Sequence, residues 1–412
     1  MSSNHIKVTD RATKIEYAIR DVVVPATKLE EEGHEIIKLN IGDPLAYPGL
    51  PTPEHMVQAF QEALSKQENG YSHSYGMMDL RIAISKNEKS KNNGGWNCNP
   101  DDVYVCHGVT EALQIIFAAF LEEGDLLLSP GPHYPPYLTY PQLYGGRTVE
   151  YRLNPSDNWK IDFDDLESKM NENVKLLVLI NPNNPTGGII TEEELDRVIK
   201  ITEKWPQCTI ISDEIYDRLN FDNSHISAAS RSKSVPVITL NGVSKVYYAP
   251  GWRIGYMAIH DPENRLTKVR DGIERLLRSR LCASTPAQKG YLAGLSENDD
   301  WMLKYLNKVK KQRDVCVKRI NEIEGLEVQV PAGAFYMFVK LTDPQWQNND
   351  KKFVLDLLHE EHVLLVHGSG FSPEFGKGHV RLVYLPDEKI LNESFDRIDR
   401  FLTRHRENFS DS

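Results

Sequence analysis

Between residues 101 and 259 the chain alternates short runs of β-branched or leucine residues with longer amphipathic stretches. This alternation is typical of βαβ units, in which helices connect parallel strands and cover the sheet. We therefore predict an α/β fold with a mostly parallel seven-stranded sheet flanked by helices. The seven predicted strands lie at residues 103–106, 125–129, 147–151, 176–180, 209–212, 237–240 and 254–259.

Two of the amphipathic stretches begin with residues that favour helix starts. Thr110 precedes an apolar stretch at 113–121, and Thr191 precedes another at 195–205. Threonine is a common helix N-cap because its side-chain oxygen accepts a hydrogen bond from an unpaired backbone N–H group. Glu194 lies three residues after Thr191, which is the spacing of a capping box. We therefore expect helices to begin at these two threonines.

The pattern changes after residue 286. A long helical stretch at 287–323 is interrupted near 297–300, and two short strands follow it, at 326–330 and 334–341. This order indicates a second, smaller α+β domain. We predict an N-terminal arm that packs on the small domain, a large domain and a small domain, at residues 1–45, 46–290 and 291–412.

Three polar segments carry no chemistry that the sequence identifies. Segments 85–100 and 345–352 are rich in Asn, Gly or Lys, so we predict surface loops or frayed helix ends. The basic run at 308–313 is predicted to be the solvated face of a helix.

Composition limits the possible partners. The 412 residues include 48 Lys and Arg against 59 Asp and Glu, which gives a net charge of −11. An acidic chain repels phosphate backbones, so nucleic acid is not an expected partner. The five cysteines show no C-x-x-C spacing and the 13 histidines form no H-E-x-x-H motif. We therefore expect reduced thiols and no bound metal.

The apolar stretches also bear on the location of the protein. The longest, 113–121, is far shorter than the roughly 20 residues of a membrane-spanning helix. Residues 1–20 mix charged side chains and contain no apolar core, unlike a secretory signal. We expect a cytoplasmic protein without a membrane partner.

Polar clusters follow several of the predicted strands. They include Gly108-Val109-Thr110, the Asn- and Pro-rich segment 181–187, an Asp-Glu-Ile-Tyr segment at 213–216, and Gly-Val-Ser-Lys at 242–245. The carboxyl ends of parallel strands meet at one edge of a sheet, where ligands bind in open α/β folds. We therefore expect the four clusters to lie around one site.

These clusters resemble class I aminotransferases, which are pyridoxal-5′-phosphate enzymes of the aspartate aminotransferase fold. The resemblance runs from residue 40 to 401 and is most specific at 184–187, 213–216, 244–245 and 251–255. The resemblance implies pyridoxal phosphate as the cofactor and a homodimer with shared active sites. In finer detail, the alanine aminotransferase branch is the most similar at segments 241–245, 280–283, 286–288 and 333–338.

The resemblance assigns the central chemistry to two residues. Lys245 matches the lysine that forms the internal aldimine with the cofactor and later moves the Cα proton of the substrate. A lysine amine reacts only when neutral, so it needs a desolvated or cationic setting. Asp213 matches the partner of the pyridine nitrogen, which keeps the ring protonated as an electron sink.

The resemblance also implies the surroundings of the cofactor and the substrate. Phosphate contacts are implied for the backbone of Val109, and for Thr110, Ser244, Arg253 and, in the neighbouring subunit's site, Tyr71. The N-terminus of the helix after Gly108 suits an anion. The remaining implied roles are hydrogen bonds to the phenolic oxygen from Asn184 and Tyr216, ring stacking by Tyr134, and binding of the substrate α-carboxylate by Gly42, Asn184 and Arg381.

Transamination by a ping-pong mechanism is the predicted function, from alanine to 2-oxoglutarate, giving pyruvate and glutamate. Two alternatives stay open: an aspartate, branched-chain or aromatic preference, and a pyridoxal phosphate-dependent carbon–sulfur lyase. A further alternative is the effector module of a transcription regulator. The last needs a DNA-binding domain, and the approximately 40 residues before Ile41 are too few and not basic enough. Arg280 is only a candidate for holding the distal carboxylate of glutamate.

Overall fold

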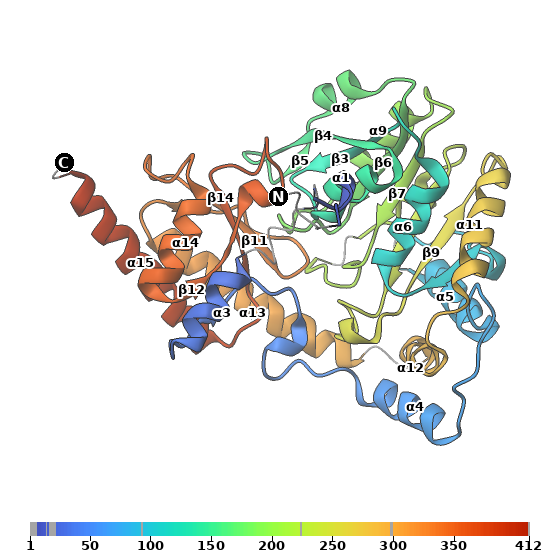
Figure 1. The fold of residues 1–412 in the computed structure, drawn as a ribbon, viewed down its shortest axis with the longest axis horizontal. Helices are drawn as coiled ribbons and strands as arrows, with labels where there is room; N and C mark the ends of the chain where they lie inside the picture. Colours follow the sequence, from blue (N-terminus) through green and yellow to red (C-terminus); the bar gives the residue numbers. More distant parts are fainter. Residues whose placement is uncertain are drawn as a thin grey trace.

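Two of the three sheets in the described residues, one of eight strands and one of four, organise the chain (Figure 1). In the figure the larger sheet, in green and yellow, lies beside the orange and red C-terminal part, and the blue helix α3 packs with the latter. The predicted boundaries between an arm and two domains stay a prediction. The computed structural model describes residues 6–13, 15, 22–91, 94–222, 225–296 and 300–410, without the side chains of the last three.

The larger sheet has eight strands in the order β2-β9-β8-β7-β6-β3-β4-β5. Strands β8, β7, β6, β3 and β4 are parallel, and β9 runs antiparallel to both neighbours. All seven predicted strands are present, and the two-residue β5 adds an antiparallel edge strand. Their bounds are β2 Val103–Cys106, β3 Leu126–Gly131, β4 Arg147–Asn154, β5 Lys160–Ile161, β6 Val174–Ile180, β7 Thr209–Asp213, β8 Val237–Gly242 and β9 Gly255–His260.

Helices cover both faces of this sheet, which explains why its central strands are continuously apolar. Ile210 and Ile211 are neighbours on β7, yet they belong to two separate core layers, one on each face. One layer is closed by α6 and α11, which pack against each other. The helices of this part are α4 Glu54–Ser65, α5 Met78–Ser90, α6 Val109–Phe120, α7 Pro136–Thr139, α8 Phe163–Lys169, α9 Glu192–Thr202, α10 Ala228–Arg231, α11 Thr267–Arg280 and α12 Thr285–Ser296.

The two predicted helix starts have different outcomes. Helix α9 begins with the predicted capping box, in which Thr191 and Glu194 bond each other's backbone N–H groups. Helix α6 begins at Val109, and its N-cap is Gly108 rather than Thr110. Gly108 has φ +77°, a conformation that glycine adopts readily, so the turn into the helix forms before the threonine is reached.

The smaller sheet is antiparallel, in the order β10-β11-β14-β13. Of the predicted interruption at 297–300, residues 297–299 lie outside the described residues, whereas Asp300 is the first residue of α13, and α12 ends at Ser296. Beside the sheet, β1 pairs with β12 in parallel. The remaining elements are α1 Asp10–Thr13, α3 Val23–Glu31, β1 Ile37–Lys38, α13 Asp300–Glu322, β10 Leu326–Glu327, β11 Tyr336–Leu341, α14 Asp350–Glu361, β12 Val363–Leu364, β13 Val366–His367, β14 His379–Val383 and α15 Glu388–Ser410.

The prediction of surface loops is wrong for parts of both polar segments. In 85–100, helix α5 continues to Ser90, and Glu88 and Trp96 are buried. The indole Nε1 of Trp96 donates to the Glu88 carboxylate (3.0 Å), so the polar atoms of this segment satisfy each other inside the protein. In 345–352, Trp346 and Asp350 are buried.

The basic run at 308–313 is only partly solvated. Gln312 is buried in helix α13, where its amide donates to the carbonyls of Leu385 and Pro386 (2.8 and 2.7 Å). The prediction of a solvated face is therefore wrong for this residue, because it anchors the segment that precedes α15. None of the described helices is long and apolar enough to span a membrane.

Candidate active site

A cavity of about 550 Å³ lies where the larger sheet meets the smaller one. Its lining comes from the carboxyl ends of β6 and β7, the turn after β8, the first turn of α6, and residues of β11 and β14. The four predicted clusters therefore converge. Of the sequence-predicted residues, it is lined by Gly42, Val109, Thr110, Tyr134, Asn184, Asp213, Tyr216, Ser244, Lys245, Arg253 and Arg381.

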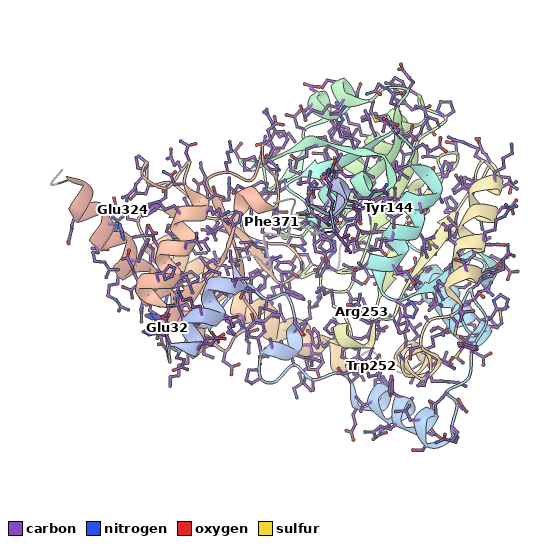
Figure 2. All side chains as sticks on the ribbon, viewed as in Figure 1. Glu32, Tyr144, Trp252, Arg253, Glu324 and Phe371 are labelled. Carbon is purple, nitrogen blue, oxygen red and sulfur yellow. The ribbon has the colours of Figure 1, made fainter. Side chains whose placement is uncertain are left out.

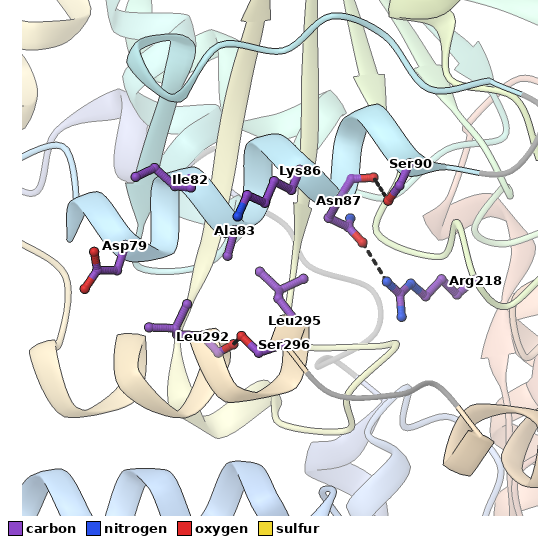
Figure 3. A pocket seen from close by; sticks show the side chains of 10 residues that line it. All are labelled: Asp79, Ile82, Ala83, Lys86, Asn87, Ser90, Arg218, Leu292, Leu295 and Ser296. Carbon is purple, nitrogen blue, oxygen red and sulfur yellow. Dashed lines mark hydrogen bonds between the residues drawn. The ribbon is translucent and has the colours of Figure 1, made fainter.

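Another pocket, of about 570 Å³, opens between α5 and α12 (Figure 3). It contains none of the predicted site residues, and Arg218 reaches its edge to donate to Asn87 (2.6 Å). The chemistry is concentrated in the other cavity, although the two have similar volumes.

Lys245 projects into the cavity from the turn after β8. Its Nζ donates to the carbonyl of Gly42 (2.7 Å), which lies 203 positions earlier in the chain. Burial and the nearby Arg381 lower the pKa of Lys245 to about 8, so a substantial fraction of its amine is neutral near physiological pH. The neutral amine is the reactive form for carbonyl chemistry.

Asp213 is the last residue of β7, and its side chain is held by two donors. The hydroxyl of Tyr137 donates to Oδ2 (2.8 Å), and the backbone N–H of Ile215 donates to Oδ1 (3.3 Å). Burial raises the pKa of Asp213 to about 6, even though both hydrogen bonds lower it. A cationic ligand group at this carboxylate would therefore stabilise its charged form. Tyr137 was not predicted as part of the site, because no motif surrounds it.

The N-terminus of α6 and Arg253 form an anion cradle. Gly108 provides no side-chain cap, so the first N–H groups of this 12-residue helix point at the cavity without a competing acceptor from the N-cap. Arg253 follows Trp252 (Figure 2), and its Nη1 donates to the carbonyl of Pro250 (2.8 Å). A Cβ at Gly108 would lie only 2.5 Å from Nη2 of Arg253, so glycine permits this close approach. Ser244 lines the same cavity.

Arg381 is buried on β14 and only 1% exposed. Its Nη2 donates to the carbonyl of Asn40 (2.7 Å) and its Nη1 to Oδ1 of Asn184 (3.1 Å). Its buried Nε has no hydrogen-bond partner among the described residues. Because a buried guanidinium N–H is costly to leave unpaired, this arginine is suited to a carboxylate ligand.

Tyr216 and Tyr336 face each other across the cavity wall. Their hydroxyl oxygens are 3.0 Å apart, and both side chains are buried. Burial, with Tyr336 as the next cause, raises the pKa of Tyr216 well above its usual value, so its hydroxyl keeps its proton. Tyr336 was missed as a site residue, although its segment 333–338 contributed to the family resemblance.

Two residues that the sequence analysis singled out, Tyr71 and Arg280, do not line the cavity. Tyr71 is 84% exposed in the loop between α4 and α5 and does not line the cavity, whereas Tyr134 does. Arg280 is engaged elsewhere, because its Nη2 donates to the carbonyl of Val105 (2.6 Å) and its Nε lies 3.2 Å from the Glu111 carboxylate. Within the described part of the chain, the cavity is lined by two arginines, and Arg280 is not one of them.

Comparison with known families decides the class of protein. Residues 34–398 match the family model "Aminotransferase class I and II". The chain belongs to this aminotransferase family. The aminotransferase uses pyridoxal phosphate, as this family does.

Similar proteins span nearly the whole length of this aminotransferase. It is 37% identical over 388 residues to the alanine aminotransferase of Mycobacterium tuberculosis, covering 93% of this chain and 89% of that one. It is 35% identical over 414 residues to the glutamate-pyruvate aminotransferase AlaA of Haemophilus influenzae, covering 98% and 100%. The solved alanine aminotransferase from Pyrococcus furiosus is 48% identical, with a TM-score of 0.93 and coverage of 97% and 100%.

The described residues fit pyridoxal phosphate by their chemistry. A phosphate would meet the helix N-terminus and Arg253, and the glycine at 108 leaves the room that an added Cβ would take. A protonated ring nitrogen would compensate the buried carboxylate of Asp213. The amine of Lys245, with its lowered pKa, lies in the same cavity.

Proposed function

We propose that this aminotransferase transfers the amino group of L-alanine to 2-oxoglutarate, giving pyruvate and glutamate in two half-reactions. The convergence of Lys245, Asp213 and Arg381 on one cavity carries the proposal of amino transfer. The preference for alanine is supported by the similarity to the alanine aminotransferase of Pyrococcus furiosus, which is 48% identical.

In the proposed site, Val109, Thr110, Ser244 and Arg253 hold the phosphate, and Asp213 holds the pyridine nitrogen. The phenolic oxygen is held by Asn184 and Tyr216, and Tyr134 lies against the ring. Bound pyridoxal phosphate supplies an electron sink for the electron pair left when the substrate Cα–H bond breaks. The described geometry supports this arrangement, because all eight residues line the cavity.

The chain's own groups bind the substrate and move its proton. Arg381, with its unpaired Nε, and the backbone of Gly42 bind the α-carboxylate, and this contact fixes the orientation of the Cα–H bond. The Nζ of Lys245 would take the proton from Cα and, as a general acid, return it to C4′ of the cofactor. Its pKa of about 8 suits both roles near neutral pH.

Three further parts of the proposal concern the assembled protein. Tyr71 reaches the phosphate in the site of a second copy, which makes the working unit a homodimer; its 84% exposure supports this. We also propose a cytoplasmic location. The distal carboxylate of 2-oxoglutarate is held by a group other than Arg280, since Arg280 already pairs with Glu111 and the Val105 carbonyl.

Amino-transfer assays test the proposal directly. We expect the purified holoenzyme to transfer amino groups from alanine to 2-oxoglutarate faster than from aspartate, valine or phenylalanine. Lys245→Ala should lose transfer by several orders of magnitude, and Asp213→Asn should bind the cofactor but turn over far more slowly. Transfer that survives Lys245→Ala unchanged would contradict the mechanism. A preference for aspartate or an aromatic donor would contradict the substrate, and release of a thiol from cysteine conjugates would favour a carbon–sulfur lyase.

A further inference from the structure

Tyr336 connects the carboxylate-binding strand to the cofactor-facing part of the cavity. It is the first residue of β11, and Phe338, two positions on, pairs with Arg381 on β14. In an antiparallel pair, these three side chains therefore share one face of the sheet. The Arg381 guanidinium carbon lies 4.5 Å from the centre of the Tyr336 ring.

The hydroxyl of Tyr336 reaches Tyr216 because two backbone segments meet. Ala334 donates its N–H to the carbonyl of Leu219 (2.7 Å), which ties the start of β11 to the loop after β7. The opposite side of the hydroxyl is bounded by Gly42, where an added Cβ would overlap the Tyr336 oxygen. The hydroxyl is therefore placed by packing on both sides.

The charges around the pair favour one direction of hydrogen bonding. A guanidinium over the Tyr336 ring makes its hydroxyl a stronger donor, whereas the nearby Asp213 carboxylate makes the Tyr216 oxygen a stronger acceptor. A tyrosine hydroxyl has one proton to donate and lone pairs to accept. If Tyr336 donates to Tyr216, the Tyr216 proton is left for an acceptor in the cavity.

We propose that Tyr336 is a positioning residue that donates to Tyr216 and thereby directs and strengthens the hydrogen bond that Tyr216 offers to the cofactor's phenolic oxygen. The juxtaposition of the two hydroxyls, with the guanidinium of Arg381 behind Tyr336, carries this inference. It rests on the part of the proposed function that places the phenolic oxygen at Tyr216. It does not depend on which amino acid is the donor substrate.

The visible spectrum of the bound cofactor provides a readout other than activity. A weaker donor at the phenolic oxygen leaves that oxygen more basic, so the pH midpoint of the cofactor's absorption change should rise. We expect Tyr336→Phe to raise this midpoint by about 0.3–1 pH unit, the effect of losing one neutral hydrogen bond in a cooperative pair. Tyr216→Phe should raise it further, because it removes the direct donor.

A double-mutant cycle separates positioning through Tyr216 from any other effect. Because Tyr336 acts through Tyr216, the double variant Tyr216→Phe/Tyr336→Phe should have the midpoint of Tyr216→Phe alone. An unchanged or lowered midpoint in Tyr336→Phe, or the same increment on both backgrounds, would overturn the proposal.

Tyr151→Phe is the matched control, since it also removes a buried tyrosine hydroxyl, one that donates to the Val178 carbonyl (2.8 Å) outside the cavity. It should lower thermal stability about as much as Tyr336→Phe and leave the spectral midpoint unchanged; a midpoint shift equal to that of Tyr336→Phe would overturn the proposal.

The spectral test is independent of the substrate. A holoenzyme that prefers aspartate over alanine would contradict the proposed function and leave the expected midpoint shift intact.

Discussion

At the residue scale, burial moves the two central titratable groups of the site in opposite directions. Desolvation disfavours charge, so it lowers the pKa of Lys245 to about 8 and raises that of Asp213 to about 6. Both groups therefore titrate within two pH units of neutrality in the cofactor-free protein. The cavity keeps an amine and a carboxyl available for chemistry that ordinary side chains perform poorly at pH 7.

The reactivity of Lys245 provides a prediction for one residue. The cations Arg381 and Arg253 oppose its protonation, while Asp43 and Asp213 favour it. Modification of Lys245 by an amine-selective acylating reagent, followed by peptide mass spectrometry, should show a midpoint near pH 8 in the cofactor-free protein. Arg381→Met should raise that midpoint, because Arg381 opposes the protonation of Lys245 more strongly than Arg253 does.

Arg381→Lys is the control for this measurement, because it keeps a positive charge at the same position on β14. We expect its midpoint to stay closer to the wild-type value than that of Arg381→Met. Equal midpoints in Arg381→Met and the wild type would show that Arg381 does not lower the pKa of Lys245.

Site residues could be predicted from the sequence where a motif or a position directly after a predicted strand indicated their chemistry. Lys245, Asp213 and Arg253 follow strands or lie in segments with a specific pattern, so they could be singled out before any fold was known. Tyr137 could not, because its role comes from a hydrogen bond between α7 and the last residue of β7. Tyr336 belonged to a recognisable segment, but its hydroxyl became relevant only when the two sheets were placed together.

At the element scale, the N-terminus of α6 depends on a glycine that the sequence did not identify as the cap. Gly108 has φ +77°, and a side chain there would be strained and would also press on Arg253. We expect Gly108→Ala to lower stability by about 1–3 kcal/mol, because its φ of +77° and ψ of 169° lie in a region that is strained for a residue with a Cβ. It should also weaken cofactor binding by roughly tenfold or more, measured by fluorescence titration, because Arg253 must move.

Gly272→Ala is the matched substitution in a helix. Gly272 lies inside α11 with open space around an added Cβ, so alanine should stabilise the protein by about 0.5–1 kcal/mol and leave cofactor affinity unchanged. Wild-type affinity in Gly108→Ala would contradict the role assigned to this turn.

Asp213 at the end of β7 and Tyr216 in the loop after it lie next to residues of a buried ionic cluster. Lys91 Nζ lies 2.8, 2.9 and 3.2 Å from the carboxylates of Glu88, Glu214 and Asp217. Burial opposes the charge of Lys91, but the three carboxylates hold its pKa well above the usual value. This cluster explains why the polar segment 85–100 is buried, since its charges are paired inside the protein.

Removal of the single lysine should therefore be costly. Lys91→Met leaves three buried carboxylates without their cation, and we expect a loss of about 3–5 kcal/mol in the free energy of unfolding. Urea denaturation of the variant measures this loss. Lys89→Met, at an exposed position in the last turn of α5, should change stability by less than about 0.5 kcal/mol. Similar losses in the two variants would show that the cluster contributes little.

At the scale of the whole molecule, the net charge of −11 does not attract the anionic cofactor and substrates. The attraction comes from a local arrangement, in which Lys245, Arg253, Arg381 and the N-terminus of α6 face one cavity. The cavity is assembled from both sheets, so its electrostatics depend on how the sheets are held together. The sequence predicted the sheets but could not predict this junction, because its contacts join residues more than 100 positions apart, such as Tyr216 with Tyr336 and Lys245 with Gly42.

One part of the junction contains the carboxyl group of Glu150, whose side chain is only 10% exposed. The backbone N–H of His133 donates to the carbonyl of Phe371 (3.1 Å), and Phe375 packs over Gly131. Glu150 lies beside them, with its Oε1 3.8 Å from Nε2 of His133, too far for a hydrogen bond. Burial raises the pKa of Glu150 to about 7 and lowers that of His133 to about 3, so no proton on the imidazole compensates the carboxylate near neutral pH.

The raised pKa of Glu150 predicts how stability depends on pH. Its usual value is 4.5, so the folded protein binds more protons than the unfolded chain between pH 4.5 and 7. Stability is therefore lost as pH rises through this range, by about 3 kcal/mol at most, and the loss is complete above pH 7. Glu150→Gln removes this loss, so its advantage over the wild type in urea denaturation should grow from pH 4.5 to 7 and then stay constant. Glu172→Gln, at an exposed position, is the control for a missing carboxylate; an equal pH-dependent gain there would exclude the junction as the cause.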